Sequence, residues 1–404
     1  MCTRWSCLPL LLALIACGDP VPPPAPAPED APAQPSGVRR GLWVLAEGAE
    51  RALESEAGIE TLIERATELG VSDVFVQVYR GGRSWFPSDY ADDAPYREIA
   101  ATQDEPPLDR LLRLAHARGM RVHAWFNCLR LASNRNAPLL ERVGPQAVLV
   151  DRQGHSLLDY PDGRIPAPDG NYFRLGTPGL WLDPAIPEVV EYLERTLDDL
   201  IAAAPGLDGL HLDIIRFPLA LPFAPGSRFE LGVDFGYAPE SRRRFEEESG
   251  KPFAPGSAWD AFRRARVGEV VRRLSERVPE SWEMSAAVLS HADRAYYVAM
   301  QDWRHWLEQG WLDFAVAMAY TRDHAMLRYL AHSLSGGVAG ERIWLGLGAW
   351  LFLDRPQEIV RQIELALEPE PAGWVLFSYD SLMQAPASLD AIRGAIGGDA
   401  APGP

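Results

Sequence analysis

Apolar residues recur in eight short runs along the chain, and each run is followed by a stretch with helical periodicity. The strand-like runs cover residues 41–46, 71–79, 121–127, 207–215, 283–290, 314–320, 343–350 and 374–379. The amphipathic stretches cover residues 49–69, 107–118, 187–203, 258–277, 303–308, 323–333, 356–367 and 389–396. A strand followed by a helix eight times is typical of a (β/α)8 TIM barrel, an α/β fold. We therefore predict one such barrel over residues 39–397.

Two connections are too long to be ordinary loops. Residues 128–186 follow the third predicted strand, and residues 217–257 follow the fourth. Both insertions leave from carboxyl ends of strands, so we expect them to build the walls of a substrate cleft. An open doubly wound sheet alternates in the same way, but it rarely reaches eight units, and no Gly-x-Gly-x-x-Gly follows the first strand. Gly346 and Gly348, in the seventh strand, are expected to relieve crowding in the barrel rather than to bind a phosphate.

The N-terminal residues differ in composition from the rest of the chain. An apolar run from Leu8 to Ala16 is too short to span a bilayer, and it predicts an export signal over residues 1–16. Small residues ahead of Cys17 resemble a bacterial lipobox, so we expect cleavage before Cys17 and lipidation of its thiol. Residues 17–38 then form a tether rich in proline and alanine. We expect a protein anchored by lipid on the periplasmic side of the outer or inner membrane. The alternative is an ordinary secretory signal.

Composition narrows the choice of partners. The chain has 404 residues, 47% of them hydrophobic, and a formal charge of −17, which suits one large domain with a sizeable core. No basic stripe is present to neutralise phosphates, so nucleic acid is not an expected partner. Once Cys2 and Cys7 leave with the signal and Cys17 is lipidated, Cys128 is the one remaining thiol, and no internal disulfide is expected. Residues 398–404 are predicted to be a disordered tail, and no protein partner is indicated.

The fourth predicted strand carries the strongest chemical pattern. His211 and Asp213 share one parity, so both point to the face opposite Leu212. Carboxylates at the carboxyl ends of barrel strands usually do chemistry, and Asp213 is therefore our main catalytic candidate. The structural alternative is an ion pair of Asp213 with a basic neighbour.

Glycoside hydrolysis commonly uses two carboxyl groups. The candidates for the second one are Glu47, after the first predicted strand, and Asp380, after the eighth. Both are expected at the same end of the barrel as Asp213.

Aromatic, amide and basic side chains gather near the same strand ends. Aromatic faces stack on the C–H surfaces of sugars and polar groups hold the hydroxyls, so we predict a mouth that binds a polyhydroxylated ring. The candidate substrate-binding residues are Gln77, Tyr79, Arg80, His123, Trp125, Asn127, Arg130, His211, Arg216, His291, Tyr320, Trp350 and Tyr379. The alternative for any one of them is a polar group that satisfies a neighbour inside the barrel. No dense histidine cluster occurs, so neither a metal site nor another cofactor is predicted.

Several of these stretches resemble the glycosyl-hydrolase-like family ten. The run Asp208-Gly209-Leu210-His211-Leu212-Asp213-Ile214-Ile215-Arg216-Phe217-Pro218 is the most specific part, and Arg40-Gly41-Leu42-Trp43, His123-Ala124-Trp125-Phe126-Asn127 and Trp181-Leu182-Asp183-Pro184 also match. The resemblance covers residues 39–397. It implies a bacterial envelope lipoprotein with a (β/α)8 barrel, in a family of which some members cleave peptidoglycan glycan strands that lack stem peptides. It also places the family's fourth-strand aspartate at Asp213, with Arg216 beside it.

The resemblance thus implies a glycosidase that acts on a β-linked amino-sugar polymer of the cell envelope. Ile214 and Ile215 depart from the pattern, because many relatives carry an acid or a tyrosine there and a chitinase-like pattern would put a glutamate at position 215. Assistance by an N-acetyl group of the substrate would remove the need for a protein nucleophile. The competing hypothesis is a non-catalytic glycan-binding lipoprotein on a decayed glycosidase barrel. Polysaccharide deacetylation would need a metal cluster that the sequence does not show.

Overall fold

The computed structural model describes residues 37–223, 233–336 and 339–396. The predicted export signal, the lipidation site Cys17, nearly all of the tether and the tail over residues 398–404 lie outside the described residues. No helix among those described is long and apolar enough to cross a membrane.

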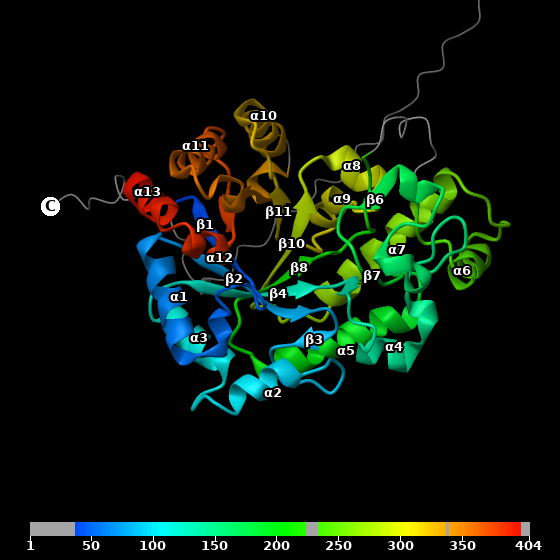
Figure 1. Ribbon diagram of the computed structural model, residues 1–404, viewed down its shortest axis with the longest axis horizontal. Coiled ribbons are helices and arrows are strands. Elements are labelled where there is room, and N and C mark those ends of the chain that lie inside the picture. Colours follow the sequence, from blue (N-terminus) through cyan, green and yellow to red (C-terminus); the bar gives the residue numbers. More distant parts are fainter. Residues whose placement is uncertain (1–36, 224–232, 337–338, 397–404) are drawn as a thin grey trace, which may run out of the picture. The chain divides into compact units, whose positions relative to one another are not determined.

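Eight parallel strands close into a barrel, which confirms the predicted fold (Figure 1). In barrel order they are β1 (Arg39–Val44), β2 (Asp73–Arg80), β4 (Arg121–Asn127), β8 (Gly209–Asp213), β10 (Glu283–Leu289), β11 (Phe314–Met318), β12 (Ile343–Gly348) and β13 (Gly373–Phe377). β13 pairs with β1, and β1 pairs with β2, so the ring has no open edge. The short strand β3 (Arg83–Ser84) adds to β2 in an antiparallel hairpin.

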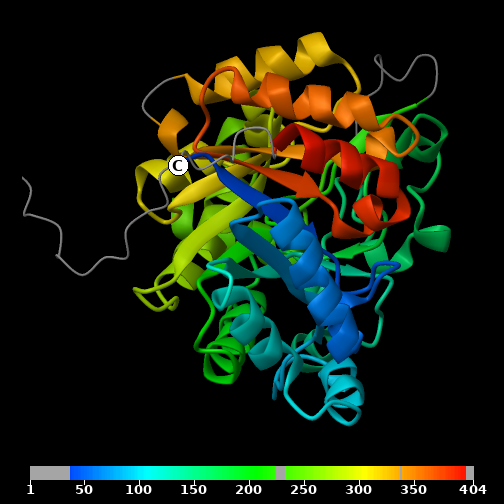
Figure 2. The same ribbon diagram turned by 90° about the vertical axis from the view of Figure 1, so that its left-hand side faces the viewer.

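Helices surround the strands, as Figures 1 and 2 show. The predicted helices that follow the successive barrel strands are α1 (Glu56–Glu68), α3 (Pro107–His116), α5 (Pro187–Ala203), α7 (Ser257–Ser275), α9 (Trp303–Glu308), α10 (His324–Ser335), α11 (Pro356–Leu367) and α13 (Pro386–Ile396). The periodicity did not predict the short helices α2 (Ala94–Ala100), α8 (Ala292–Tyr297) and α12 (Tyr379–Gln384). α1 begins later than predicted because the side chain of Ser55 accepts the Gly58 N–H at 3.0 Å and caps the helix there.

The strands separate two apolar cores. Outward side chains such as Val74 and Val76 pack against the helices, whereas inward ones such as Phe75 fill the barrel. The barrel interior is crowded by indole rings, and glycine makes room for them. A Cβ atom at Gly346 would lie 2.9 Å from the Trp43 ring, which confirms that this glycine relieves crowding.

The two long insertions fold together. The first contains β5 (Arg130–Ala132), α4 (Pro138–Val143), β6 (Phe173–Leu175) and β7 (Leu180–Trp181), and the second contains β9 (Ala220–Pro222) and α6 (Pro239–Ser249). β6 pairs with β9, so one insertion is tied to the other, and β5 pairs with β7. A separate apolar cluster forms around Trp259, with Tyr237, Phe245 and Phe262. In Figure 1 the elements of both insertions gather on the right-hand side.

Single-turn 3-10 helices complete the chain. They are η1 (Ala52–Glu54), η2 (Pro145–Ala147), η3 (Leu157–Asp159), η4 (Pro161–Gly163), η5 (Asp169–Asn171), η7 (Gly340–Arg342) and η8 (Ala349–Phe352).

Candidate active site

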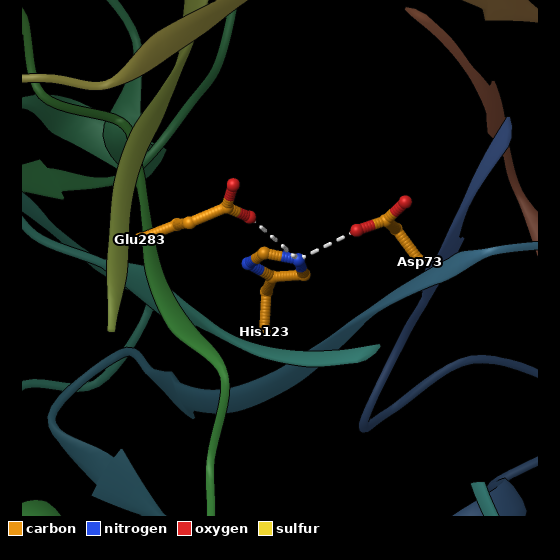
Figure 3. A group of neighbouring side chains, drawn as sticks. All are labelled: Asp73, His123 and Glu283. Atoms are coloured by element: carbon orange, nitrogen blue, oxygen red, sulfur yellow. Dashed lines mark hydrogen bonds and ion pairs between the residues drawn. The ribbon is translucent and has the colours of Figure 1, made fainter. Parts of the chain in front are cut away.

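The inward side chains of the barrel lie at different heights along its axis. Height in this sense divides the predicted site residues into those near the amino-terminal end and those at the mouth. His123, near the start of β4, lies at the amino-terminal end of the barrel (Figure 3). Its Nε2 lies 3.0 Å from the Oδ1 of Asp73, and its ring stacks on Phe75. The side chain is fully buried. The prediction that His123 lines the mouth is therefore wrong, because a hydrogen bond and a ring contact hold it at the opposite end.

Figure 3 shows His123 between two carboxylates, Asp73 and Glu283. Within the described part of the chain, these three residues form a group that could hold a metal ion. Each offers one ligand atom of a suitable type, and these atoms all lie within 4.8 Å of one another. Two guanidinium groups already compensate the carboxylates: Arg39 hydrogen-bonds to both, and the Nε of Arg121 lies 3.1 Å from Asp73. Burial alone would raise the pKa of Asp73, but hydrogen bonds from His123 and Arg39 hold it well below its usual value. We therefore assign the cluster to a buried ion-pair network that closes the floor of the barrel.

His211 lies one layer higher but still below the mouth. Its Nε2 accepts a hydrogen bond from the Trp43 Nε1–H at 3.1 Å, and its Nδ1 lies 2.9 Å from the Oγ of Ser285. Burial lowers the pKa of His211 well below its usual value, so the imidazole is neutral. Both ring nitrogens are occupied and the side chain is fully buried. The predicted role of His211 in substrate binding is corrected to a structural one.

Asp213 ends β8 at the mouth, where it is half-buried. The Trp125 Nε1–H donates to its Oδ2 at 3.1 Å, and the Ile214 N–H donates to its Oδ1 at 2.6 Å. Ile214 has a φ of +53°, a rare conformation for a β-branched residue, and this turn lets its N–H reach the carboxylate. Burial raises the pKa of Asp213, and the donors and nearby arginines only partly oppose that effect. A carboxyl group in this state can act as a general acid.

Cationic and aromatic groups surround this carboxyl. Arg216 stacks over the Trp181 ring at 5.1 Å and donates to the Phe217 carbonyl at 3.2 Å. Burial lowers the pKa of Arg216 to about 10, although the charge of Asp213 favours the cation. Burial, and to a lesser extent the charge of the same carboxylate, raise the pKa of the Tyr320 phenol well above its usual value.

Aromatic rings line the base of the mouth. Phe377 lies 5.8 Å from the ring of Tyr320 and 6.2 Å from that of Trp125. Half-buried Leu45 and Met318 belong to the same inner cluster. The candidate residues predicted from the sequence did not include Phe377, Leu45 or Met318, although their inward parity was visible in the alternation of each strand.

Two amide side chains have unused acceptors. The Oδ1 of Asn127 and the Oε1 of Gln77 are buried and have no hydrogen-bond partner among the described residues. Asn127 is level with Asp213 in the pairing of β4 with β8, and Gln77 is level with Trp125. Because buried polar atoms are almost always paired in native proteins, these two acceptors fit a ligand that donates hydroxyl or amide hydrogens.

Three further candidates are buried against other parts of the fold, and their predicted roles are corrected. The pairing of β2 with β4 shifts register between Gln77 and Tyr79, which turns Tyr79 outward to stack on Phe126 at 4.2 Å. Tyr379 is buried at the start of α12, where burial and neighbouring carboxylates raise its pKa to about 12. Asp380 is also buried, and its Oδ1 accepts the Glu50 N–H at 2.9 Å. It therefore braces the loop after β1 and is not a second catalytic carboxylate.

The remaining candidates follow the carboxyl ends of strands. Glu47 forms ion pairs with Arg80, at 3.3 Å, and with Arg83, and it lines a cavity of about 320 Å³. His291 is exposed immediately before α8. Trp350, in η8, is 45% exposed, which leaves its ring available for stacking. Arg130 lies in β5, close enough to Asp213 for each charge to affect the pKa of the other group. Their roles stay predictions.

The chain that forms this mouth is similar to known proteins. Residues 39–329 match the family "Glycosyl hydrolase-like 10". The chain belongs to this family. Glycosyl hydrolase DigH of Escherichia coli K12 is 25% identical over an alignment of 439 positions, which covers 94% of this chain and 93% of the relative. Glycosyl hydrolase YngK of Bacillus subtilis is 22% identical over 361 residues, which cover 81% of this chain and 64% of the relative.

A solved structure supports the architecture. The catalytic domain of a β-amylase from Paenibacillus polymyxa aligns with a TM-score of 0.54 at 9% identity, over 90% of this chain and 99% of that domain. At this identity the likeness concerns the barrel alone. Membership of the glycosyl hydrolase-like 10 family supports a hydrolase that acts on glycans, with the mouth around Asp213 as its candidate active site.

Proposed function

We propose that this member of the family hydrolyses glycosidic bonds in a peptidoglycan-type glycan, with Asp213 as the general acid. One observation carries the proposal. Asp213 is half-buried at the barrel mouth, its pKa is raised, and Trp125 holds its carboxyl group. The choice of peptidoglycan rests on the resemblance of the fourth-strand motif to envelope glycosidases.

In the proposed reaction, the protonated carboxyl of Asp213 gives its proton to the glycosidic oxygen while the bond from that oxygen to C1 breaks. The hydrogen bonds from Ile214 and Trp125, together with the charge of Arg216, stabilise the carboxylate that forms. Asn127 and Gln77 accept hydrogen bonds from the sugar at their free amide oxygens.

A second group must stabilise C1 as the glycosidic bond breaks. Of the two candidates for a second carboxylate, Asp380 braces the loop after β1, and Glu47 is held in ion pairs by two arginines. This environment favours substrate assistance. The carbonyl oxygen of an N-acetyl group attacks C1 as the leaving sugar departs, and water then opens the cyclic intermediate. Glu47 is the alternative second carboxylate.

The protein is proposed to act in the cell envelope, held to the membrane by a lipid on Cys17. Mass spectrometry of the mature protein should then find Cys17 as its first residue, with acyl chains attached. A mature protein without acyl chains on Cys17 would contradict lipid anchoring.

Digestion of purified peptidoglycan, intact and stripped of stem peptides, tests the reaction. Products are identified by mass spectrometry for the parent, for Asp213→Asn and for Asp109→Asn, a control on the exposed first turn of α3. Oligosaccharide release that Asp213→Asn abolishes and Asp109→Asn leaves unchanged is the expected result. Binding of the glycan without any release would contradict hydrolysis and favour a non-catalytic glycan-binding protein on the same barrel.

A further inference from the structure

A second cavity, of about 660 Å³, opens next to the mouth. Its walls come mainly from the insertion after β4, with Arg80 from the end of β2. We call it the arginine groove, after the three arginines among its lining residues, Arg80, Arg130 and Arg135. Asp162 is the one carboxylate among the lining residues. The groove is therefore locally cationic, although the whole chain carries a formal charge of −17.

Two of these arginines are held by backbone oxygens rather than by acids. The guanidinium of Arg130 donates to the Pro178 carbonyl at 3.0 and 2.5 Å, and that of Arg135 donates to the Leu158 carbonyl at 2.9 Å. Neither forms an ion pair with any carboxylate of the described residues, whereas Arg80 shares Glu47 with Arg83. The two side chains are thus oriented without being neutralised.

The surroundings of Arg130 show that its charge is incompletely compensated. Burial and the nearby charge of Arg80 lower the pKa of Arg130, and the charge of Asp213 opposes them only in part. An anion in the groove would supply the missing compensation. Because the Leu129 N–H donates to the Ile214 carbonyl at 3.3 Å, Arg130 follows directly after a residue that contacts the turn at Asp213, and such an anion would lie close to the bond that is cleaved.

We propose that the arginine groove is a subsite for a carboxylate carried by the glycan on a sugar next to the one at Asp213. The inference rests on the proposed function and adds the acidic character of the substrate. Planar guanidinium groups bind carboxylates through paired, charge-assisted hydrogen bonds, and two arginines oriented by carbonyl oxygens are prepared for that geometry. The carboxylate has two possible sources, a lactyl ether on an amino sugar or a hexuronate.

The test compares acidic and neutral forms of one glycan. Peptidoglycan strands freed of stem peptides carry free lactyl carboxylates, and carbodiimide coupling to methylamine converts these into uncharged amides. A third substrate alternates hexuronate with N-acetylhexosamine. The mature chain is assayed as parent, Arg130→Gln and Arg135→Gln. Arg118→Gln, exposed after α3, is the matched control. Binding is measured by calorimetry in the Asp213→Asn background, and kcat/KM is measured with active Asp213.

We expect the parent to prefer the acidic strand over its amide by about tenfold or more in kcat/KM and in Kd, the usual size of one charge-assisted contact. Arg135→Gln should remove most of that preference by weakening only the acidic form, and Arg118→Gln should change nothing. Added salt should reduce the preference, because screening weakens the attraction. A stronger preference for the hexuronate chain would support the subsite and identify the other source of the carboxylate.

The failure of the subsite differs from the failure of hydrolysis. Equal cleavage of the acidic and amidated strands by the parent would overturn the subsite and leave the hydrolase intact. Equal losses for both strands in Arg135→Gln would overturn it too, because they would reveal a purely structural arginine. Arg135-dependent binding of the acidic strand without cleavage of any glycan would support the subsite and contradict the hydrolase.

Discussion

His123 and Asn127 point inward from opposite ends of the same strand, and we predict that alanine has opposite effects at the two positions. His123→Ala should destabilise the fold and leave the KM for the glycan unchanged. Asn127→Ala should raise KM and leave stability almost unchanged. The sequence assigned both residues to the substrate, so the pair tests directly whether height in the barrel decides their roles.

The magnitudes follow from the contacts of each residue. His123→Ala removes a buried hydrogen bond to Asp73 at 3.0 Å and a ring stacked 4.7 Å from Phe75. A buried hydrogen bond to a charged group is worth about 1.5–3 kcal/mol, and deletion of a buried ring costs about 3–5 kcal/mol. Because these two contributions overlap, we expect the free energy of unfolding to fall by about 3–5 kcal/mol. At roughly 2 °C per kcal/mol for a domain of this size, Tm should fall by about 6–10 °C.

Asn127→Ala breaks no hydrogen bond, because the Oδ1 has no partner among the described residues. The free energy of unfolding should therefore change by less than about 1 kcal/mol. If Oδ1 accepts a hydrogen bond from the bound sugar, its loss should cost about 1.5 kcal/mol of binding, or roughly tenfold in KM.

Thermal unfolding followed by circular dichroism gives Tm for the parent and both variants. Steady-state hydrolysis of stem-free strands, well below the lowest Tm, gives kcat and KM. An unchanged Tm with a raised KM in His123→Ala would refute the structural role of His123. Likewise, an Asn127→Ala variant that melts early and binds normally would show that height does not separate the two roles.

Three further predictions concern charge and space. A general acid must be protonated, so kcat/KM should fall as pH rises through the raised pKa of Asp213. Trp125→Phe removes a hydrogen bond to the carboxylate and should move this fall in the pH profile to higher pH. A fall at the same pH in both proteins would assign the proton to another group. The pKa of Asp73 is lowered by folding, so its stabilisation is present above about pH 4 and lost as pH falls. Urea unfolding of Asp73→Asn should therefore show lower stability at pH 7 and a shallower loss in acid than the parent. Gly48→Ala puts a methyl group against the Asp380 carboxylate and should lower stability by about 2 kcal/mol, measured by urea unfolding; no change would mean that the loop adjusts freely.

The barrel was predictable because its two cores impose two different patterns. Each strand must present apolar side chains to the helices, and that alternation is visible in every predicted strand. The same parity correctly turned His123, Trp125 and Asn127 inward. Parity does not give height, however, and the chemistry of an inward residue depends on whether it lies at the floor, as His123 does, or at the mouth, as Asn127 does.

Parity also fails where the backbone leaves the regular strand. Tyr79 was expected inside, but the register shift after Gln77 turns it outward. Tyr379 and Asp380 were expected at a strand end, but β13 stops at Phe377 and the chain turns into α12. Irregularities of this kind arise from packing around the whole ring, which no local pattern of one strand contains.

The two isoleucines after Asp213 also lie where the backbone leaves the regular strand. In a regular strand Ile215 would share the inward parity of Asp213, and a glutamate at that position would be a second acid in the mouth. The positive φ at Ile214 breaks the alternation, and Ile215 is fully buried in the core between strands and helices. A carboxylate there would be surrounded by apolar side chains and face away from the substrate. In this backbone the stabilisation of C1 must therefore come from the substrate or from another strand end, and not from position 215.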